Sequence, residues 1–203
     1  MANVMVIYAH PGQRFSHAGR VMAQAARGVD GLTFVDLYDE YPRHDIDVAQ
    51  EQERLLAHDV IVFQFPLYWY STPSLLKEWQ DLVLQYGFAY GSEGKALAGK
   101  TMALAITTGG PEDAYAPGGY NNHELRAFLM PLQQTAALCQ MHFTDPFVLY
   151  GALAAQKNPE LAKTHAAAYA RFLTAIRDDT AALKDTGGVR KAEDYPAQTK
   201  AQA

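Results

Sequence analysis

The sequence predicts a doubly wound α/β fold, in which helices cover both faces of a parallel sheet of five strands. Three observations lead to this class. Short apolar runs alternate along the chain with longer segments whose apolar residues recur at helical spacing. The run Val60–Phe65 is almost continuously apolar, as is typical of a strand covered on both faces. Loops rich in aromatic residues or glycine follow two of these runs, at the sheet edge where such folds hold ligands.

Each apolar run is expected to form one strand, and the strands lie at residues 4–9, 32–37, 60–65, 101–106 and 143–150. Helices are expected between and after them, at residues 16–26, 50–57, 73–86, 123–138 and 159–176. Because strands alternate with helices, neighbouring strands should pair in parallel through crossover connections.

Three prolines mark the boundaries of these helices. Thr72 can cap the third helix and Pro73 suits its first position, where a missing N–H is not needed. Pro131 either lies inside the fourth helix or breaks it, and Pro159 starts the last helix.

The length of the chain fits one domain. Its 203 residues, of which 49% are hydrophobic, can bury a full interior. We therefore expect a single domain over residues 1–185. The periodicity stops after Thr186, and the polar composition beyond it predicts a flexible C-terminal tail over residues 186–203.

Charge and composition exclude several classes of protein. The formal net charge is −5 and no basic stretch occurs, so no nucleic acid partner is expected. No apolar run is long enough to cross a bilayer, and the single cysteine, Cys139, agrees with a reducing compartment and a place in the core, so a cytoplasmic location is expected. Histidines such as His44 show no metal-ligand spacing, and no metal is expected.

The loop after the first strand, His10–His17, lacks both the G-x-G-x-x-G turn and the P-loop signature. It opens a helix at Ser16, where backbone N–H groups can receive one phosphate, with His10, His17 or Arg14 as further donors. Ser16 would serve equally as an ordinary helix cap, so this signal has two interpretations.

Two further loops suggest a wall and a floor for a flat aromatic cofactor. Tyr68, Trp69 and Tyr70 follow the third strand, where three aromatic side chains need a ligand or a partner to cover them. The alternative is a hydrophobic plug or a dimer seam. Thr107–Gly110 follows the fourth strand and combines hydroxyl donors with glycines that allow close approach, although a plain turn would also use two glycines.

Taken together and in order, these segments carry a resemblance to a known family. They are Ile7–Pro11, Ser16–Ala18, Phe65–Tyr70, Leu75–Trp79, Thr107–Gly110, and also Gly87–Gly91 and Pro131–Thr135. The chain resembles the flavodoxin-like NAD(P)H:quinone oxidoreductases over residues 4–149. It is most similar to the bacterial ancillary flavoproteins of glutathione-regulated potassium efflux systems. The resemblance implies a flavodoxin-like sheet with strand order 2-1-3-4-5.

The resemblance also implies a cofactor site. Residues that match the family's phosphate and ribityl contacts are His10, Ser16, His17, Ala18 and Gly19. Those that match the lining of the isoalloxazine ring are Pro66, Leu67, Tyr68, Trp69 and Tyr70. Those that match contacts to its pyrimidine edge are Thr107, Thr108, Gly109 and Gly110.

Two residues are expected to be catalytic on the same basis. Tyr115 matches a tyrosine that stabilises charge on the reduced flavin, and it also joins the cofactor-binding set. The family's cooperating histidine falls near Asn121, which makes His123 the adjacent candidate. The family's asparagine at the position of Gly19 is missing here, so one phosphate donor is absent.

The function implied is two-electron hydride transfer from NAD(P)H to a quinone through bound FMN, in a ping-pong cycle. FAD is the alternative flavin, and azo or nitro compounds are alternative acceptors. A homodimer is expected, with Tyr86, Phe88 and Tyr90 as its seam or as an extension of the core. The alternative function is that of a cytoplasmic regulatory subunit of a potassium/proton antiporter, at the inner face of the membrane, with little essential catalysis.

Overall fold

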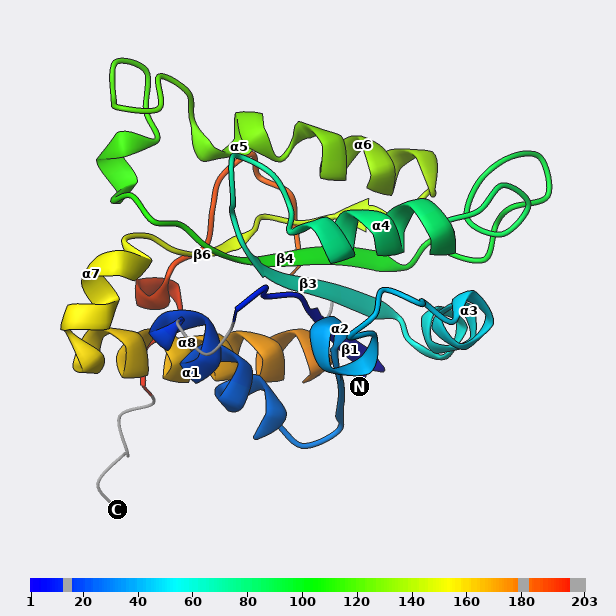
Figure 1. Ribbon diagram of the computed structural model, residues 1–203, viewed down its shortest axis with the longest axis horizontal. Coiled ribbons are helices and arrows are strands. Elements are labelled where there is room, and N and C mark those ends of the chain that lie inside the picture. The colour runs from blue at the N-terminus through cyan, green and yellow to red at the C-terminus, as the bar shows by residue number, and fades with distance from the viewer. Residues whose placement is uncertain (13–15, 179–182, 198–203) are drawn as a thin grey trace.

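One parallel sheet lies at the centre of the computed structural model, which describes residues 1–12, 16–178 and 183–197 (Figure 1). Its strands run in the order β2-β1-β3-β4-β5, and β6 also pairs with β4. The strands are β1 (Val4–Tyr8), β2 (Leu32–Asp36), β3 (Val60–Pro66), β4 (Thr101–Thr107), β5 (His142–Phe143) and β6 (Phe147–Leu149). All ladders are parallel, so the predicted flavodoxin-like topology is confirmed.

Helices cover both faces of the sheet. The main helices are α1 (His17–Arg27), α3 (Val48–Ala57), α4 (Ser74–Val83), α6 (Met130–Leu138) and α8 (Pro159–Asp178). Shorter ones are α2 (Leu37–Glu40), α5 (Leu125–Phe128) and α7 (Ala152–Lys157), with 3-10 turns η2 (Glu112–Ala114) and η4 (Ala192–Asp194). In Figure 1, α4, α5 and α6 lie over one face, and α1, α7 and α8 lie over the other.

The two faces of each strand carry different side chains because successive residues point to opposite sides. In β4, Met102, Leu104 and Ile106 enter the core under α4 and α6. The intervening Ala103 and Ala105 enter the core under α1 and α8. Large residues therefore fill the space on one side, while alanines let the long helix α8 lie close on the other.

The predicted fifth strand is divided into two. Between β5 and β6, Pro146 has no N–H to donate to a ladder, and the N–H of Asp145 donates instead to the carbonyl of Lys184. The prediction of one strand over residues 143–150 was wrong on this point, although Pro146 was visible in the sequence.

Helix boundaries near prolines also differ from the prediction. Pro73 is itself the N-cap of α4, and the Thr72 hydroxyl has no hydrogen-bond partner among the described residues, so Thr72 does not cap the helix. The predicted helix over residues 123–138 is two helices, α5 and α6, with Pro131 in the first turn of α6. Pro159 begins α8 as expected.

The aromatic residues after α4 serve mainly the core. Phe88 and Tyr90 are partly buried against it, whereas Tyr86 is exposed and meets Tyr90 edge-on. The interpretation of Phe88 and Tyr90 as an extension of the core agrees with this packing.

Within residues 183–197, Arg190 pairs with Phe147 of β6. The division into a domain over residues 1–185 and a flexible tail stays a prediction, and residues 198–203 lie outside the described residues. None of the helices within the described ranges has the length and apolar character that crossing a membrane requires.

Candidate functional site

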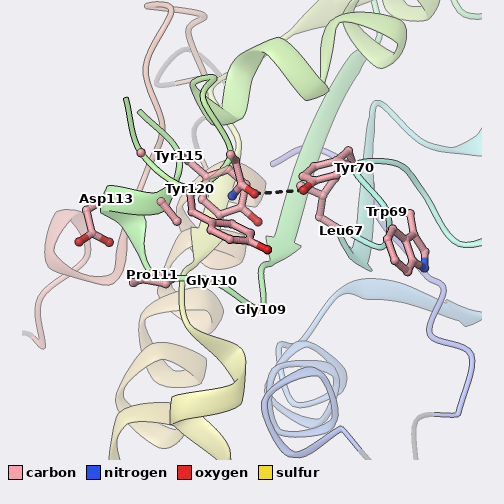
Figure 2. A pocket seen from close by; sticks show the side chains of 12 residues that line it. Leu67, Trp69, Tyr70, Gly109, Gly110, Pro111, Asp113, Tyr115 and Tyr120 are labelled. Carbon is pink, nitrogen blue, oxygen red and sulfur yellow. Dashed lines mark hydrogen bonds between the residues drawn. The ribbon is translucent and has the colours of Figure 1, made fainter. Parts of the chain in front are cut away.

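Two adjoining hollows open at the carboxyl ends of β1, β3 and β4. The first, of about 520 Å³, lies beside the start of α1 and is here called the helix-side hollow. The second, of about 500 Å³, is lined by Tyr70, Tyr115 and Tyr120 and is called the tyrosine hollow (Figure 2). Both hollows are lined by Leu67, Trp69 and Gly109, so they lie side by side and share these residues.

The position of the helix-side hollow follows from the topology. The chain leaves β1 toward α1 on one face of the sheet and leaves β3 toward α4 on the other. Two neighbouring parallel strands whose connections diverge in this way leave a crevice at their carboxyl ends. The loops after β1 and β3 both line this hollow.

The start of α1 supplies hydrogen-bond donors to the helix-side hollow. Ser16 is the N-cap, and its hydroxyl oxygen accepts the N–H of Gly19 at 3.1 Å. The first N–H groups, those of His17 and Ala18, have no acceptor within the helix. His17 Nε2 is buried and has no hydrogen-bond partner among the described residues. Unpaired donors at a positive helix end suit a phosphate group.

His10 lies behind this helix end in a defined state. Its Nδ1 is 2.9 Å from the carbonyl of Pro11, and because a carbonyl only accepts, Nδ1 carries the proton. Burial lowers the pKa of His10, against the opposing effect of its backbone hydrogen bonds, so the ring is neutral. Its Nε2 is therefore an acceptor, 3.5 Å from the hydroxyl of Tyr68. This nitrogen suits a ligand hydroxyl better than a phosphate oxygen.

Gly19 lies behind the hollow and does not line it. A Cβ at this position would come within 2.8 Å of Ser16 Oγ and 2.9 Å of His10 Cδ2. The missing side chain lets the capping serine and the imidazole sit together. This is a steric reason for glycine where the resemblance implies asparagine.

The aromatic loop is a two-residue hairpin. Tyr68 and Ser71 exchange backbone hydrogen bonds of 3.1 and 3.0 Å, and the two residues between them, Trp69 and Tyr70, have φ values of 48° and 63°. Turns with two positive φ values normally use asparagine and glycine, so bulky aromatics here store strain. Trp69 is 93% exposed at the junction of the two hollows.

The loop after β4 forms the floor. Thr107 and Thr108 are buried, and the Thr108 hydroxyl donates to the carbonyl of Gly110 at 2.9 Å. A Cβ on Gly109 would make only an ordinary contact of 3.7 Å with Leu153. Packing within the protein therefore does not require this glycine, and its missing side chain leaves room in both hollows.

Tyr115 is held by aromatic neighbours in the tyrosine hollow. Its ring lies 6.1 Å from Phe128, edge-on, and 5.8 Å from Tyr150. Burial raises the pKa of Tyr115, although the nearby side chains of Thr108 and Asn121 oppose the effect. Burial, with Glu112 and Tyr115 nearby, likewise raises the pKa of Tyr150 to about 12. Both phenols stay protonated at neutral pH, and Tyr115 can donate a hydrogen bond to a ligand.

The structure brings nearly all the predicted residues together. All of the cofactor-binding candidates except Gly19 line one hollow or the other. His123 lines neither, because its ring packs edge-on against Phe128 at 6.0 Å. Arg14, named as a phosphate donor, lies outside the described residues.

Sequence reasoning missed one wall entirely. Ala152, Leu153 and Gln156 of α7 line the helix-side hollow, and Asn121 lines the tyrosine hollow. Asn121 was noted only as the position near which the family's histidine falls. The short α7 begins after Gly151, whose φ of 69° sets the turn, and that glycine was the only available signal. Among the described residues, no three His, Cys, Asp or Glu side chains gather to hold a metal.

Comparison with known proteins agrees with this geometry. The Flavodoxin_2 family, described as having a flavodoxin-like fold, matches residues 2–173. The glutathione-regulated potassium-efflux system ancillary protein KefG of Serratia proteamaculans (strain 568) is 48% identical over 170 residues, covering 84% of this chain and 92% of that protein.

Two solved structures have the same architecture. General stress protein 14 of Treponema denticola, solved in complex with FMN, has a TM-score of 0.76 and 37% identity over 87% of this chain and 98% of its own. An NADPH-quinone reductase of P. pentosaceus has a TM-score of 0.72 and 28% identity over 84% of this chain and 96% of its own. With its fold, its switch-point crevice and its sequence in agreement, the chain belongs to the Flavodoxin_2 family of flavodoxin-like proteins.

Proposed function

We propose that this protein is an NAD(P)H:quinone oxidoreductase that holds FMN across its two hollows. The observation that carries the proposal is that the two hollows adjoin and share lining residues. The helix-side hollow offers unpaired donors at a helix N-terminus, and the tyrosine hollow offers three tyrosine side chains around an open space. A molecule with a phosphate at one end and a flat ring at the other fits this arrangement.

The residues at the helix end suit a single phosphate. The donors are the N–H groups of His17 and Ala18, and the buried Nε2 of His17, which has no partner among the described residues, would join them in the tautomer that carries its proton there. One helix terminus without a glycine-rich loop accommodates one phosphate better than a pyrophosphate, which favours FMN over FAD. The acceptor nitrogen of His10 would take a hydroxyl of the ribityl chain.

The ring would lie between the loop Pro66–Tyr70 and the floor at Thr107–Gly110. Bound FMN would supply two-electron redox chemistry. Tyr115, whose raised pKa keeps its proton in place, would donate a hydrogen bond where negative charge collects. His123 faces Phe128 instead, so we assign it no part in the reaction.

The tyrosine hollow would take the two substrates in turn. Its walls include Tyr70, Tyr115 and Tyr120, which suit the flat faces of a nicotinamide and then of a quinone. Because both would occupy the same space, the cycle would be ping-pong. Trp69 and Tyr120 are largely exposed, and we propose that a second copy of the chain covers them in a homodimer.

A second candidate function rests on the sequence comparison. The 48% identity to a protein named as an ancillary protein of a potassium-efflux system favours a regulatory partnership with such a membrane system. Fold and site do not separate this role from catalysis, and one protein can perform both.

An absorbance spectrum of the purified protein tests the redox proposal. We expect a yellow protein that is bleached by NADPH without oxygen and recoloured by a quinone, and that releases FMN on denaturation. A colourless protein that binds neither FMN nor FAD would refute the oxidoreductase and leave the ancillary role.

Ser16→Asp tests the place of the phosphate. Aspartate caps a helix as well as serine does, so the fold is kept, but its charge opposes a phosphate. We expect FMN affinity to fall about 100-fold or more, while affinity for riboflavin, which has no phosphate, stays unchanged. Ser74→Asp places the same charge at an exposed position of α4 as a control. Equal losses for FMN and riboflavin would contradict the assignment.

A further inference from the structure

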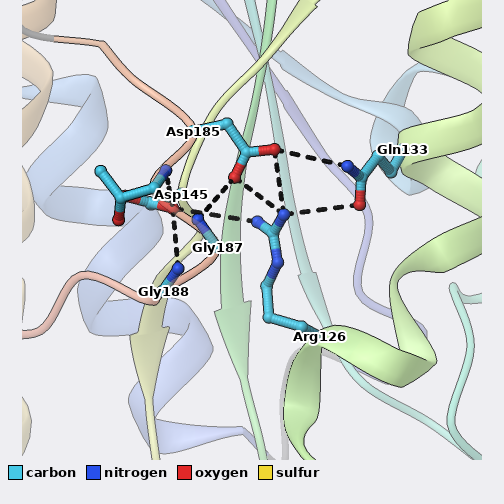
Figure 3. Close-up of polar contacts among 7 residues, drawn as sticks. Arg126, Gln133, Asp145, Asp185, Gly187 and Gly188 are labelled. Carbon is cyan, nitrogen blue, oxygen red and sulfur yellow. Dashed lines mark hydrogen bonds and ion pairs between the residues drawn. The ribbon is translucent and has the colours of Figure 1, made fainter.

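Residues 183–195, after α8, are here called the C-terminal strap. Near its start, the strap is held by the buried carboxylate of Asp145, which lies between β5 and β6 (Figure 3). Asp145 is only 4% exposed and accepts the N–H and the hydroxyl of Thr186 at 2.9 and 2.7 Å. It also accepts the N–H of Gly188 at 3.2 Å. Three hydrogen bonds to one buried carboxylate fix the turn at residues 186–188.

Arg126 of α5 holds the same turn from the other side. Its Nη2 donates to both carboxylate oxygens of Asp185 at 2.8 and 3.0 Å, and its Nη1 lies 4.0 Å from Asp145. Figure 3 shows the guanidinium between the two acids, with Gln133 beside it. The strap is therefore tied both to the β5–β6 connection and to the helix that follows the tyrosine hollow.

Further along, the strap pairs with the edge of the sheet. The N–H of Arg190 donates to Pro146 at 2.8 Å, and its carbonyl accepts from Val148 at 2.9 Å. This pairing covers β6, and Tyr150, just beyond β6, packs against the ring of Tyr115 at 5.8 Å. The strap thus braces the strand that carries one neighbour of Tyr115.

A second connection to Tyr115 passes through Lys191. Its ammonium lies 3.0 and 3.1 Å from the two carboxylate oxygens of Glu112. Glu112 opens the turn η2, and the N–H of Tyr115 donates to the carbonyl of Glu112 at 2.9 Å. An ion pair at Lys191 therefore acts on the backbone that presents Tyr115 to the hollow.

Lys191 is itself held in place. Its N–H donates to Asp194 at 2.7 Å, while the carbonyl of Tyr195 accepts from Arg171 of α8 at 2.7 Å. The ring of Tyr195 packs against Phe172 at 5.4 Å. With fixed points on both sides, Lys191 can hold Glu112 at lower entropic cost than a lysine on a free tail.

We propose that the C-terminal strap positions Tyr115, with Lys191 as a positioning residue that acts through Glu112. The strap lies beyond residue 173, where the match to the family ends. The effect on catalysis rests on the proposed oxidoreductase function, whereas the effect on the turn at residues 111–116 does not.

Amide hydrogen exchange over residues 111–116 of the full chain tests whether the strap holds this turn in place, which is here called the mechanical part of the proposal. Because the pair is partly exposed, Lys191→Met should speed exchange there roughly two- to five-fold. The charge exchange Glu112→Lys with Lys191→Glu should restore it. Lys184→Met removes an exposed lysine from the same strap and should change nothing at residues 111–116. An unchanged rate in Lys191→Met, or no recovery on charge exchange, overturns the proposal.

Asp145→Asn separately tests the hydrogen bonds that hold the start of the strap. It should speed exchange about ten-fold or more over residues 185–191, and also over residues 111–116. Faster exchange in the strap alone would show that the strap does not position the turn. If this variant fails to fold, Lys191→Met and the charge exchange decide.

Steady-state kinetics tests the catalytic part. Lys191→Met should lower kcat/KM for a quinone roughly two- to five-fold in the native background and have no further effect in a Tyr115→Phe background. Equal effects in both backgrounds would overturn the link to Tyr115. A protein without flavin or activity would refute the oxidoreductase proposal and leave the exchange results to decide the mechanical part.

Discussion

The hydroxyl of Tyr70 donates a hydrogen bond of 3.1 Å to Oδ1 of Asn121, across the tyrosine hollow (Figure 2). The Tyr70 ring also stacks on Phe128, with centroids 4.7 Å apart. These contacts join the aromatic hairpin after β3 to the loop that follows η2. The width of the hollow is therefore set by one hydrogen bond and one stacking contact between segments far apart in the sequence.

Tyr70→Phe removes the hydrogen bond and keeps the stacking. We expect KM for the quinone to rise about two- to ten-fold, because the hollow widens, while FMN affinity stays within about two-fold. Steady-state kinetics and flavin titration measure the two quantities. Tyr86→Phe removes a hydroxyl from an exposed tyrosine away from the hollows and serves as the control. A loss of FMN affinity with unchanged KM would show that the Tyr70 hydroxyl serves the flavin and not the width of the substrate space.

Because the hairpin is strained, relieving the strain at Trp69 should stabilise the protein without flavin and weaken FMN binding. Trp69 has a φ of 48°, which asparagine tolerates far better. Trp69→Asn should therefore raise the free energy of unfolding without flavin by about 0.5–1 kcal/mol and weaken FMN binding about ten-fold. Denaturant unfolding and flavin titration check the pair of effects.

Gln140 provides a matched control for that variant. It is exposed, has a φ of 57° and lines neither hollow. Gln140→Asn should give a similar gain in stability and leave FMN binding unchanged. If Trp69→Asn destabilised the protein, strain would not explain the conformation of the hairpin.

Gly19→Ala tests the packing at the phosphate end. The new Cβ would lie too close to Ser16 Oγ and His10 Cδ2, so one of them must move. We expect a loss of about 1–3 kcal/mol in unfolding free energy and a fall in FMN affinity of about ten-fold or more. Thermal unfolding and flavin titration measure both.

The same substitution at Gly28, the C-cap of α1, is the control. A Cβ there would meet its nearest backbone atom at an ordinary 3.5 Å, and the φ of −85° suits alanine. Gly28→Ala should leave FMN affinity unchanged and keep or slightly raise stability. Equal behaviour of the two variants would show that the space at Gly19 is not critical.

His165 gives the stability of the protein a dependence on pH. Burial on α8 lowers its pKa from an ordinary 6.5 to about 4. Between these values the unfolded chain takes up a proton that the folded protein does not, so stability is full above pH 6.5 and falls as the solution is acidified toward pH 4. Between pH 7 and pH 5, His165 alone should lower the free energy of unfolding by about 2 kcal/mol.

His165→Leu should remove this part of the slope, because leucine does not titrate. The variant also replaces a ring whose Nε2 has no partner among the described residues. His142→Gln, at an exposed position, should keep the native slope. Denaturant unfolding at several pH values between 5 and 7 would disprove the assignment if His165→Leu kept the full dependence.

Local sequence patterns predicted a strand correctly where a single segment was apolar over nearly its whole length. The runs at Val60–Phe65 and Thr101–Ile106 became β3 and β4 because a continuously apolar segment has few places other than the centre of a sheet. Their loops then met at one edge, since parallel strands end together. That is why so many of the predicted cofactor residues share the two hollows, although their contacts with a flavin stay a prediction.

Features made by contacts between distant segments could not be predicted in this way. His123 is a candidate only through its place beside Asn121, whereas its ring packs on Phe128, which in turn stacks on Tyr70 of the distant hairpin after β3. Leu153 of α7 carried no sign that it would line the helix-side hollow. The hydrogen bonds from Thr186 to the buried carboxylate of Asp145 also join segments far apart in the sequence, while the flexible tail stays a prediction.

The sequence by itself determined the first four strands and their parallel pairing, and it predicted the loops that line the two hollows, because apolar runs and turn residues are patterns of residues close together along the chain. The tertiary structure decided the hydrogen bond between Tyr70 and Asn121, the place of α7 and the attachment of the C-terminal strap. Each of these joins segments distant in sequence, and such a contact is favourable only after the sheet has brought its partners together.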